Sequence, residues 1–184
     1  MREIALHILD IVQNSIVAKA TKIGVDIKED YDADKLTVII SDNGCGMSEE
    51  FLKKVIDPFT TKRTTRNVGL GIPLFKLAAE NTGGSFKIES EEGKGTIVTA
   101  VFGHSHIDRQ PLGDIKGTML GLFTAHEEIQ FVYSHKINDK EFTVDTAEIK
   151  GILGEVPFST PDVYLWLSEY LKEGEDEISN QTEV

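Results

Sequence analysis

The chain has 184 residues, of which 40% are hydrophobic and 27% are charged, a composition typical of a folded globular protein rather than a disordered one. No apolar run approaches the roughly 18 residues that a transmembrane helix requires, and the start of the chain lacks the pattern of a secretion signal. The single cysteine, Cys45, cannot form an internal disulfide bond. We therefore expect a cytoplasmic protein with no membrane partner.

Charge is unevenly distributed along the chain. The net charge is −12, and residues 1–103 hold 13 lysines and arginines against 15 aspartates and glutamates, a balance of −2. Residues 104–184 hold 6 against 16, a balance of −10. A strongly negative surface repels phosphate backbones, so we expect no nucleic-acid partner. The more neutral first part leaves room for a local basic cluster that binds a phosphorylated ligand.

Residues 2–20 are predicted to form an amphipathic helix, because apolar residues recur with the helical period along one broad face. Asp10 and Asn14 fall on the opposite, polar face, one turn apart. The simplest interpretation is a solvated helix face. The functional alternative is that this carboxylate and this amide hold a water and a hydrated magnesium ion, which takes oxygen ligands.

Two strands are predicted over residues 22–28 and 35–41, joined by a polar turn. The second strand is followed at once by Asp42, and then by Gly44 and Gly46. A carboxylate at the end of a buried strand must be paired or hydrogen-bonded, and the glycines allow a ligand to approach the backbone closely. The segment predicts the wall of a small-molecule pocket, although a strand that ends in a glycine-rich turn explains the same residues.

A short helix capped by Ser48 is predicted to reach about Ile56, and Pro58 ends it. Residues 57–68 then form a loop that is rich in threonine. Its cations are Lys62, Arg63 and Arg66. Such a loop can wrap phosphates and is long enough for a lid, but it is also explained as a solvated connection.

Gly69, Leu70 and Gly71 lead directly into a helix predicted over residues 73–81. Glycines that open a helix make an anion site, because free N–H groups and the positive end of the helix dipole both lie there. The pattern alone is weak. It follows a loop and not a strand, so it does not match the dinucleotide-binding fingerprint, and the lysine of a Walker A motif is absent.

The rest of the chain is predicted to combine strands and helices. Strands are expected at 85–90, 95–102, 117–124, 129–137 and 140–144, helices at 145–153 and 160–173, and a frayed tail at 174–184. The hairpin over 129–144 either pairs only with itself or extends the first sheet. His104 and His106 lack further ligands at metal-binding spacing and are assigned to a loop.

Five segments together resemble, in order, the ATP-binding motifs of the GHKL superfamily, which groups gyrase, a heat-shock chaperone, histidine kinases and the MutL protein. These segments are Asp10–Ser15, Asp42–Met47, Asp57–Lys62, Gly69–Ile72 and Gly93–Thr96. The resemblance implies an α+β fold, the two-layer α/β sandwich called the Bergerat fold, with a mixed, mainly antiparallel sheet covered by helices. It covers residues 1–103, so residues 104–184 are expected to be a small acidic α+β extension.

The resemblance also implies roles for individual residues. At the base, Asp42 would accept a hydrogen bond from the adenine amino group, Gly44 and Gly46 would allow close approach of the base and ribose, and Thr96 would assist. At the phosphates, Asn14 would bind magnesium, Lys62 would reach the outer phosphate, and the cradle would be formed by Gly69, Leu70 and Gly71. Asp10 would take the place of the water-activating glutamate. Aspartate is one methylene shorter than glutamate, so water activation is in question. Asn67-Val68 also departs from the Gly-Thr of many relatives.

The resemblance leads us to expect a regulatory protein that binds Mg-ATP and phosphorylates a partner protein, like the anti-sigma-factor serine kinases or a detached sensor-kinase module. No helical hairpin with a phosphoacceptor histidine precedes the first motif, so we do not expect a whole sensor kinase. An ATP-gated interaction module with slow or no hydrolysis is the main alternative. A degenerate member that binds no nucleotide is a third, and a homodimer stays open.

Overall fold

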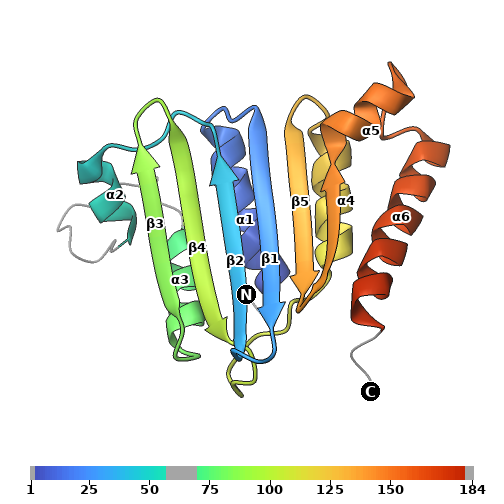
Figure 1. The fold of residues 1–184 in the computed structure, drawn as a ribbon. Coiled ribbons are helices and arrows are strands. Elements are labelled where there is room, and N and C mark those ends of the chain that lie inside the picture. Colours follow the sequence, from blue (N-terminus) through green and yellow to red (C-terminus); the bar gives the residue numbers. More distant parts are fainter. Residues whose placement is uncertain (1–2, 57–69, 181–184) are drawn as a thin grey trace.

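The computed structural model describes residues 3–56 and 70–180, in which helices cover one face of a six-stranded sheet (Figure 1). The strands are β1 (Lys22–Asp30), β2 (Lys35–Asp42), β3 (Ser85–Glu91), β4 (Gly95–Gly103), β5 (Gln130–Ile137) and β6 (Lys140–Asp145). The helices are α1 (Ile4–Val17), α2 (Glu49–Ile56), α3 (Gly71–Glu80), α4 (Ile115–Ala125), α5 (Thr146–Leu153) and α6 (Pro161–Ser179). This arrangement confirms the predicted α+β sandwich of two layers.

The sheet has the strand order β3-β4-β2-β1-β5-β6. Neighbouring strands are antiparallel except for β1 and β5, which run parallel with Val25 opposite Tyr133. The hairpin formed by β5 and β6 therefore extends the first sheet, which settles the choice that the sequence left open. Strand β5 also runs in the same direction as β4, the strand before it in the chain, so the chain must cross back between them. Helix α4 lies in this crossover connection.

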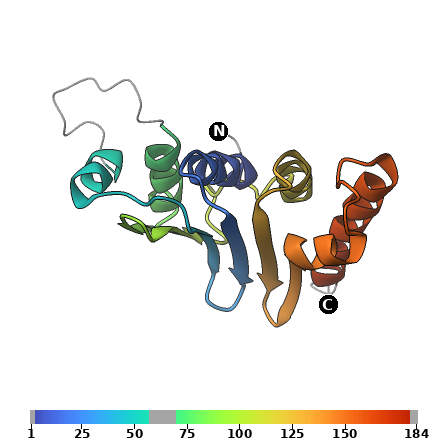
Figure 2. The same ribbon diagram turned by 90° about the horizontal axis from the view of Figure 1, so that it is seen from above.

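The helical layer buries the core against one face of the sheet. Helix α1 lies between α3 and α4 and contacts both (Figure 2). It buries Ile4, Ile8 and Val12, which recur one turn apart, while β1 buries Ile23, Val25 and Ile27 at every second position. Burial of each such side chain stabilises the fold by about 1.5–3 kcal/mol. The alternate residues of the strands face the other side of the sheet, where no helix lies among the described residues (Figure 2).

Residues 117–124 were predicted as a strand and instead form helix α4, so this prediction is wrong. The Asp114 carboxylate caps the helix by accepting a hydrogen bond from the Gly117 N–H at 2.9 Å. Met119 and Phe123, one turn apart, are both fully buried. The cap and the apolar period of four residues outweighed the β-propensity of the short apolar run.

The tail was predicted to fray from residue 174, but α6 continues to Ser179. Glu175 and Ile178 are 6% and 4% exposed, so this end of the helix is held by the interior. Two predicted caps are confirmed. The Ser48 hydroxyl accepts from the Phe51 N–H at 3.3 Å, and the Asp145 carboxylate accepts from the Ala147 N–H at 2.8 Å.

None of the helices in residues 3–56 and 70–180 combines the length and the apolar character that crossing a membrane would require. The predicted loop over residues 57–68 lies outside the described residues, together with Gly69.

Candidate functional site

Asp42 ends strand β2 and is held by two donors. The Ser15 hydroxyl, on α1, donates to one carboxylate oxygen at 2.6 Å, and the Gly44 N–H donates to the other at 2.9 Å. Each oxygen keeps a lone pair for a further donor. Ser15 is only 3% exposed, and it lies on the apolar face of α1, four residues after Ile11. The two bonds fix the carboxylate's direction, so a ligand would meet an oriented acceptor.

Beside Asp42 lies a cavity of about 290 Å³. Its apolar lining comes from the helices and from the sheet, and includes Ile11, Ile40, Val55, Ile72 and Val98. Its polar lining includes Asn14, Ser15, Asp42 and Thr96. An apolar floor with a few convergent polar groups is the usual composition of a small-molecule site, and the volume is near the lower end of the roughly 300–1,000 Å³ typical of such sites.

Gly44 and Gly46 were predicted to let a ligand approach, and the structure shows that the chain itself already needs them. Gly46 has φ +65°, and a Cβ there would lie 2.0 Å from the Glu91 carbonyl oxygen. A Cβ on Gly44 would lie 2.8 Å from the Ala18 carbonyl oxygen. The turn after β2 therefore packs tightly against α1 on one side and the β3–β4 hairpin on the other. Gly46 also lines the cavity.

Thr96 lies directly opposite Asp42 in the pairing of β2 with β4. Its hydroxyl is 2.9 Å from the Ser90 hydroxyl, which also donates to the Gly95 carbonyl at 3.0 Å. Since Ser90 has one proton, Thr96 is the donor of the bond that joins the two hydroxyls. The Thr96 oxygen then offers its lone pairs next to Asp42, on the rim of the cavity.

Asp10 and Asn14 occupy different parts of the site although they lie one turn apart on α1. Asn14 is exposed and lines the cavity, whereas Asp10 is exposed and lies outside its lining. A Cβ on Gly71 would lie 3.1 Å from an Asp10 carboxylate oxygen, so Asp10 adjoins the first residue of α3. Leu70, the residue before that helix, makes no side-chain cap hydrogen bond. Within the part of the chain that the structure describes, no hydrogen bond is made by the Gly71 or Ile72 N–H, so the start of α3 suits an anion.

The structure therefore brings most of the predicted site residues together in one region. The cavity is lined by Asn14, Asp42, Gly46 and Thr96, and Gly44 holds Asp42. Leu70 and Gly71 form the start of α3, and Asp10 of α1 adjoins it. Lys62 and Gly69 lie outside the described residues. Ser15 was missed, and the available signal was a hydroxyl residue within an otherwise apolar helix face.

A larger and shallower hollow of about 580 Å³ lies on the other face of the sheet. Its lining includes Lys22, Gly24 and Asp26, which alternate with the core residues of β1, and it shares Asp42 and Thr96 with the smaller cavity. Partial burial raises the pKa of Asp26. We assign the site to the smaller cavity, because its polar groups converge above an apolar floor enclosed by helices.

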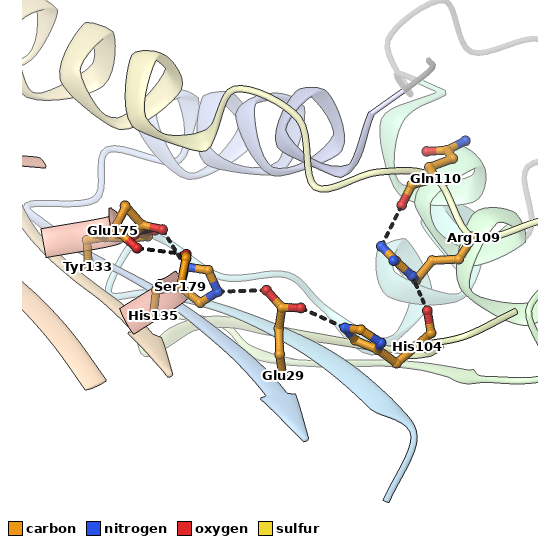
Figure 3. A network of polar contacts seen from close by, with 8 residues as sticks. All are labelled: Glu29, His104, Arg109, Gln110, Tyr133, His135, Glu175 and Ser179. Atoms are coloured by element: carbon orange, nitrogen blue, oxygen red, sulfur yellow. Dashed lines mark hydrogen bonds and ion pairs between the residues drawn. The ribbon is translucent and has the colours of Figure 1, made fainter. Parts of the chain in front are cut away.

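A second polar cluster joins the C-terminal part to β1 (Figure 3). The two ring nitrogens of His135, on β5, contact Glu175 at 2.7 Å and Glu29 at 3.0 Å. Ionised carboxylates only accept hydrogen bonds, so both nitrogens donate and His135 is an imidazolium. Burial lowers the pKa of His135, but the hydrogen bonds to the two carboxylates outweigh it and raise the pKa to about 9.

The partners of His135 are themselves satisfied. The Tyr133 hydroxyl donates to Glu175 at 2.5 Å, and His104 donates to Glu29 at 2.7 Å. Burial raises the pKa of Tyr133, as does the neighbouring Glu175 carboxylate. His104 lies in the loop predicted for it and pairs with a carboxylate. We interpret this cluster as a structural connection between β1, β5 and α6, because its polar atoms bond one another.

The comparisons with known proteins concern mainly the first part of the chain. Residues 2–106 match the family described as "Histidine kinase-, DNA gyrase B-, and HSP90-like ATPase". The chain is 36% identical over 91 residues to sporulation kinase E of Bacillus subtilis, covering 48% of this chain and 12% of that kinase. It is 32% identical over 93 residues to sporulation kinase C of the same organism, covering 50% and 22%. The chain thus spans a small fraction of these relatives.

Solved structures share the fold at low sequence identity. The N-terminal domain of a DNA repair protein superposes with a TM-score of 0.56 at 18% identity, over 78% of this chain and 52% of that one. The MutL ATPase domain of Aquifex aeolicus, solved with ADP, superposes with a TM-score of 0.51 at 11% identity, over 100% of this chain and 99% of that one. The second match includes the C-terminal part.

Proposed function

Because the chain belongs to the histidine kinase-, DNA gyrase B- and HSP90-like ATPase family, we propose that it binds Mg-ATP in the cavity beside Asp42. The observation that carries the proposal is the Asp42 carboxylate, oriented by Ser15 and Gly44 at the edge of an apolar cavity. Here the adenine amino group donates to Asp42, and the ring lies against Ile40 and Val98. Such a donor offsets the free-energy cost of keeping this carboxylate partly buried.

The phosphate end of the site follows from the position of α1 and α3. The Asn14 amide oxygen, exposed at the cavity, suits magnesium, which binds oxygen ligands and keeps several waters. When bound, the ion would neutralise phosphate charge. The uncapped start of α3 at Gly71 offers N–H groups to the phosphates, and Asp10 beside it can orient a water or accept a proton. Lys62 and Gly69 keep their predicted phosphate roles within the proposal.

Thermal unfolding with and without Mg-ATP tests the binding. A ligand at 100 times its Kd stabilises the folded state by about 2.7 kcal/mol. For a chain of this size that corresponds to a rise in Tm of about 5–10 °C. We expect this rise for the wild type and for Asp32→Ala, an exposed control in the β1–β2 turn, and little or none for Asp42→Ala. No rise in the wild type would refute the proposal.

We propose further that the protein is a regulatory kinase whose partner protein supplies the nucleophile. In that reaction the bond between the γ-phosphorus and the bridging oxygen breaks, a bond forms to a serine oxygen or histidine nitrogen of the partner, and ADP leaves. The proton of the nucleophile passes to Asp10 or to water. Most of the catalytic effect then comes from positioning and charge neutralisation.

An ATP-gated interaction module is the second candidate, favoured by the short Asp10 side chain and by the acidic C-terminal part, which lies outside the residues that the family model matches. Phosphate release from ATP in a single turnover separates hydrolysis to water from passive binding. A catalytic Asp10 that activates water predicts release by the wild type and at least about a tenfold slower rate in Asp10→Asn, with unchanged ATP affinity. A gated module and a kinase that transfers only to its partner both predict binding without release, and phosphoryl transfer on addition of the partner protein separates those two. A cytoplasmic location and a homodimer stay predictions, and the oligomeric state can be measured on the purified chain by analytical ultracentrifugation.

A further inference from the structure

Helix α6 carries an exposed pair of aromatic rings. Trp166 and Tyr170 lie one turn apart and are 46% and 37% exposed. Their rings stack with centroids 5.3 Å apart and an interplanar angle of 7°. Tyr170 also packs edge-on against Phe142 of β6 at 5.5 Å. The ring pair is therefore held in place by the protein and presents a large apolar surface to solvent.

Acidic side chains border this ring pair. Asp162 lies one turn before Trp166, Glu169 lies three residues after it, and Glu173 lies three residues after Tyr170, so all three project from the same side of the helix as the rings. All three are exposed. No ion pair joins any of them to a cation in the part of the chain that the structure describes. We call Trp166, Tyr170 and these three acids the α6 acidic aromatic face.

We propose that the α6 acidic aromatic face binds a basic segment of a partner protein, with an arginine or lysine of that segment seated on the Trp166–Tyr170 rings. Arginine and lysine are attracted to the faces of tryptophan and tyrosine rings, and the surrounding carboxylates strengthen this attraction. Exposed tryptophan and tyrosine are also the residues that most often dominate binding energy at protein interfaces. The rings supply the anchor and the acids supply the charge preference.

The charge of this face argues against other occupants. Residues 104–184 carry a balance of −10, which repels nucleic acids and anionic lipid surfaces. A symmetric contact with a second copy would place the same acids opposite one another, a costly arrangement. A basic protein segment is the occupant that both the rings and the acids attract.

The face lies at one end of the sheet, beside β6, whereas the cavity lies under β2 and β4 (Figure 1). A partner bound to α6 therefore leaves the cavity uncovered. The inference does not depend on nucleotide binding, and its failure would leave the proposed function untouched.

A peptide selection tests the proposal without knowledge of the partner. A displayed library of random 12-residue peptides is selected against the full chain, with prior depletion on Trp166→Ala. We expect the enriched peptides to carry arginine or lysine together with an apolar residue. One such peptide is then synthesised and titrated, using the fluorescence of Trp166, the only tryptophan in the chain, or polarisation of a labelled peptide where Trp166 is replaced.

The variants distinguish a specific face from general attraction to an acidic protein. We expect the Kd to rise at least tenfold in Trp166→Ala and in the double variant Glu169→Lys/Glu173→Lys, whose positions are exposed and tolerate substitution. The double variant Asp32→Lys/Glu92→Lys changes the net charge equally at distant hairpins and should change the Kd less than twofold. Acidic or uncharged selected peptides, equal losses in both double variants, or the absence of any peptide that depends on Trp166 would overturn the proposal.

Discussion

Asp42 and His135 lie on strands of the same sheet, but their surroundings differ. Asp42 is half-buried, bonded by Ser15 and Gly44, and still faces a cavity with acceptor capacity to spare. His135 is 2% exposed, and both of its ring nitrogens are occupied by carboxylates of the chain. The polar groups around Asp42 are oriented but keep free hydrogen-bonding capacity, whereas those around His135 are hydrogen-bonded to one another.

This difference distinguishes a ligand-binding site from a structural polar cluster. Polar groups that keep free capacity beside an apolar cavity are available to a ligand. Polar groups that satisfy each other in the interior hold elements together and offer a ligand nothing. The cluster around His135 ties β1 of the family-matched part to β5 and α6. The next four predictions probe these two roles in order of decreasing effect, and a fifth, on nucleotide choice, closes the section.

Removing His135 should destabilise the protein most. His135→Ala leaves the Glu29 and Glu175 carboxylates without their shared cation, and loss of one member of a buried ion pair costs about 3–5 kcal/mol in the free energy of unfolding. Urea denaturation measures this loss. His106→Ala, at an exposed histidine in the loop after β4 that pairs with Asp108 at 3.9 Å, should change the free energy of unfolding by less than about 0.5 kcal/mol. Equal losses would remove the distinction between the cluster and an ordinary surface histidine.

The pH dependence of stability should carry the signature of His135. Its pKa is raised to about 9 in the folded state from 6.5, so its stabilising contribution is complete below pH 6.5 and is lost as the pH rises through 9. The shift corresponds to a loss of about 3 kcal/mol across this window. Below pH 4.5 a different loss is expected, because burial raises the pKa of Glu29 but the hydrogen bonds from His135 and His104 outweigh it and lower that pKa.

The first of these two pH effects is measured as the difference between wild type and His135→Gln in urea denaturation at pH 6, 7, 8 and 9. The difference in the free energy of unfolding should shrink steadily over that range. A difference that stays constant with pH would contradict a charged His135 in the folded protein.

Replacement of Gly46 should cause the next largest loss of stability. Comparison with Gly93 should separate the cost of a steric clash from the cost of the backbone conformation. Gly46 and Gly93 both have positive φ, at +65° and +78°, but only a Cβ on Gly46 meets another atom, the Glu91 carbonyl oxygen at 2.0 Å. Gly93→Ala should cost about 1 kcal/mol from the backbone conformation. Gly46→Ala should cost about 1–3 kcal/mol more, from overpacking. Thermal denaturation compares the two, and similar costs would mean that the turn after β2 can move away.

Ser15→Ala should weaken nucleotide binding with a smaller effect on the fold. The substitution removes the 2.6 Å hydrogen bond that orients Asp42, and a hydrogen bond to a charged group contributes about 1.5–3 kcal/mol. We expect the Kd for Mg-ATP to rise at least about tenfold by calorimetry. Ser168→Ala, a half-buried serine on α6, is the matched control and should leave the Kd unchanged. An unchanged Kd in Ser15→Ala would show that Asp42 needs no support from α1.

Local patterns predicted much of the fold. The alternation of apolar residues set β1 and β2 within two residues of their observed ends, and the helical period set α1 and α3. The segment over 117–124 misled, because its short apolar run fits a strand or a helix. Only the cap at Asp114 and the burial of Met119 with Phe123 decide for the helix. Local propensity alone cannot arbitrate such a run.

Contacts between distant residues could not be predicted from the sequence. Helix α6 was expected to end near residue 173, but Glu175 bonds Tyr133 and His135, about 40 residues away, and these bonds hold its last turns. Likewise the Ser15–Asp42 bond joins residues 27 positions apart. The motif residues of the site were found from their order in the chain, whereas the bond from Ser15 to Asp42 appeared only in three dimensions.

The claim that Asp42 reads the adenine amino group is tested most directly by comparing ATP with inosine triphosphate, whose ring carries an oxygen in place of that amino group. Calorimetry on the wild type should show ATP binding at least about 100-fold more tightly, because the analogue leaves the carboxylate unpaired. Asp42→Asn should bind the two nucleotides within about threefold of each other, since its amide can also donate. Equal affinity of the wild type for both nucleotides would contradict the proposed role of Asp42.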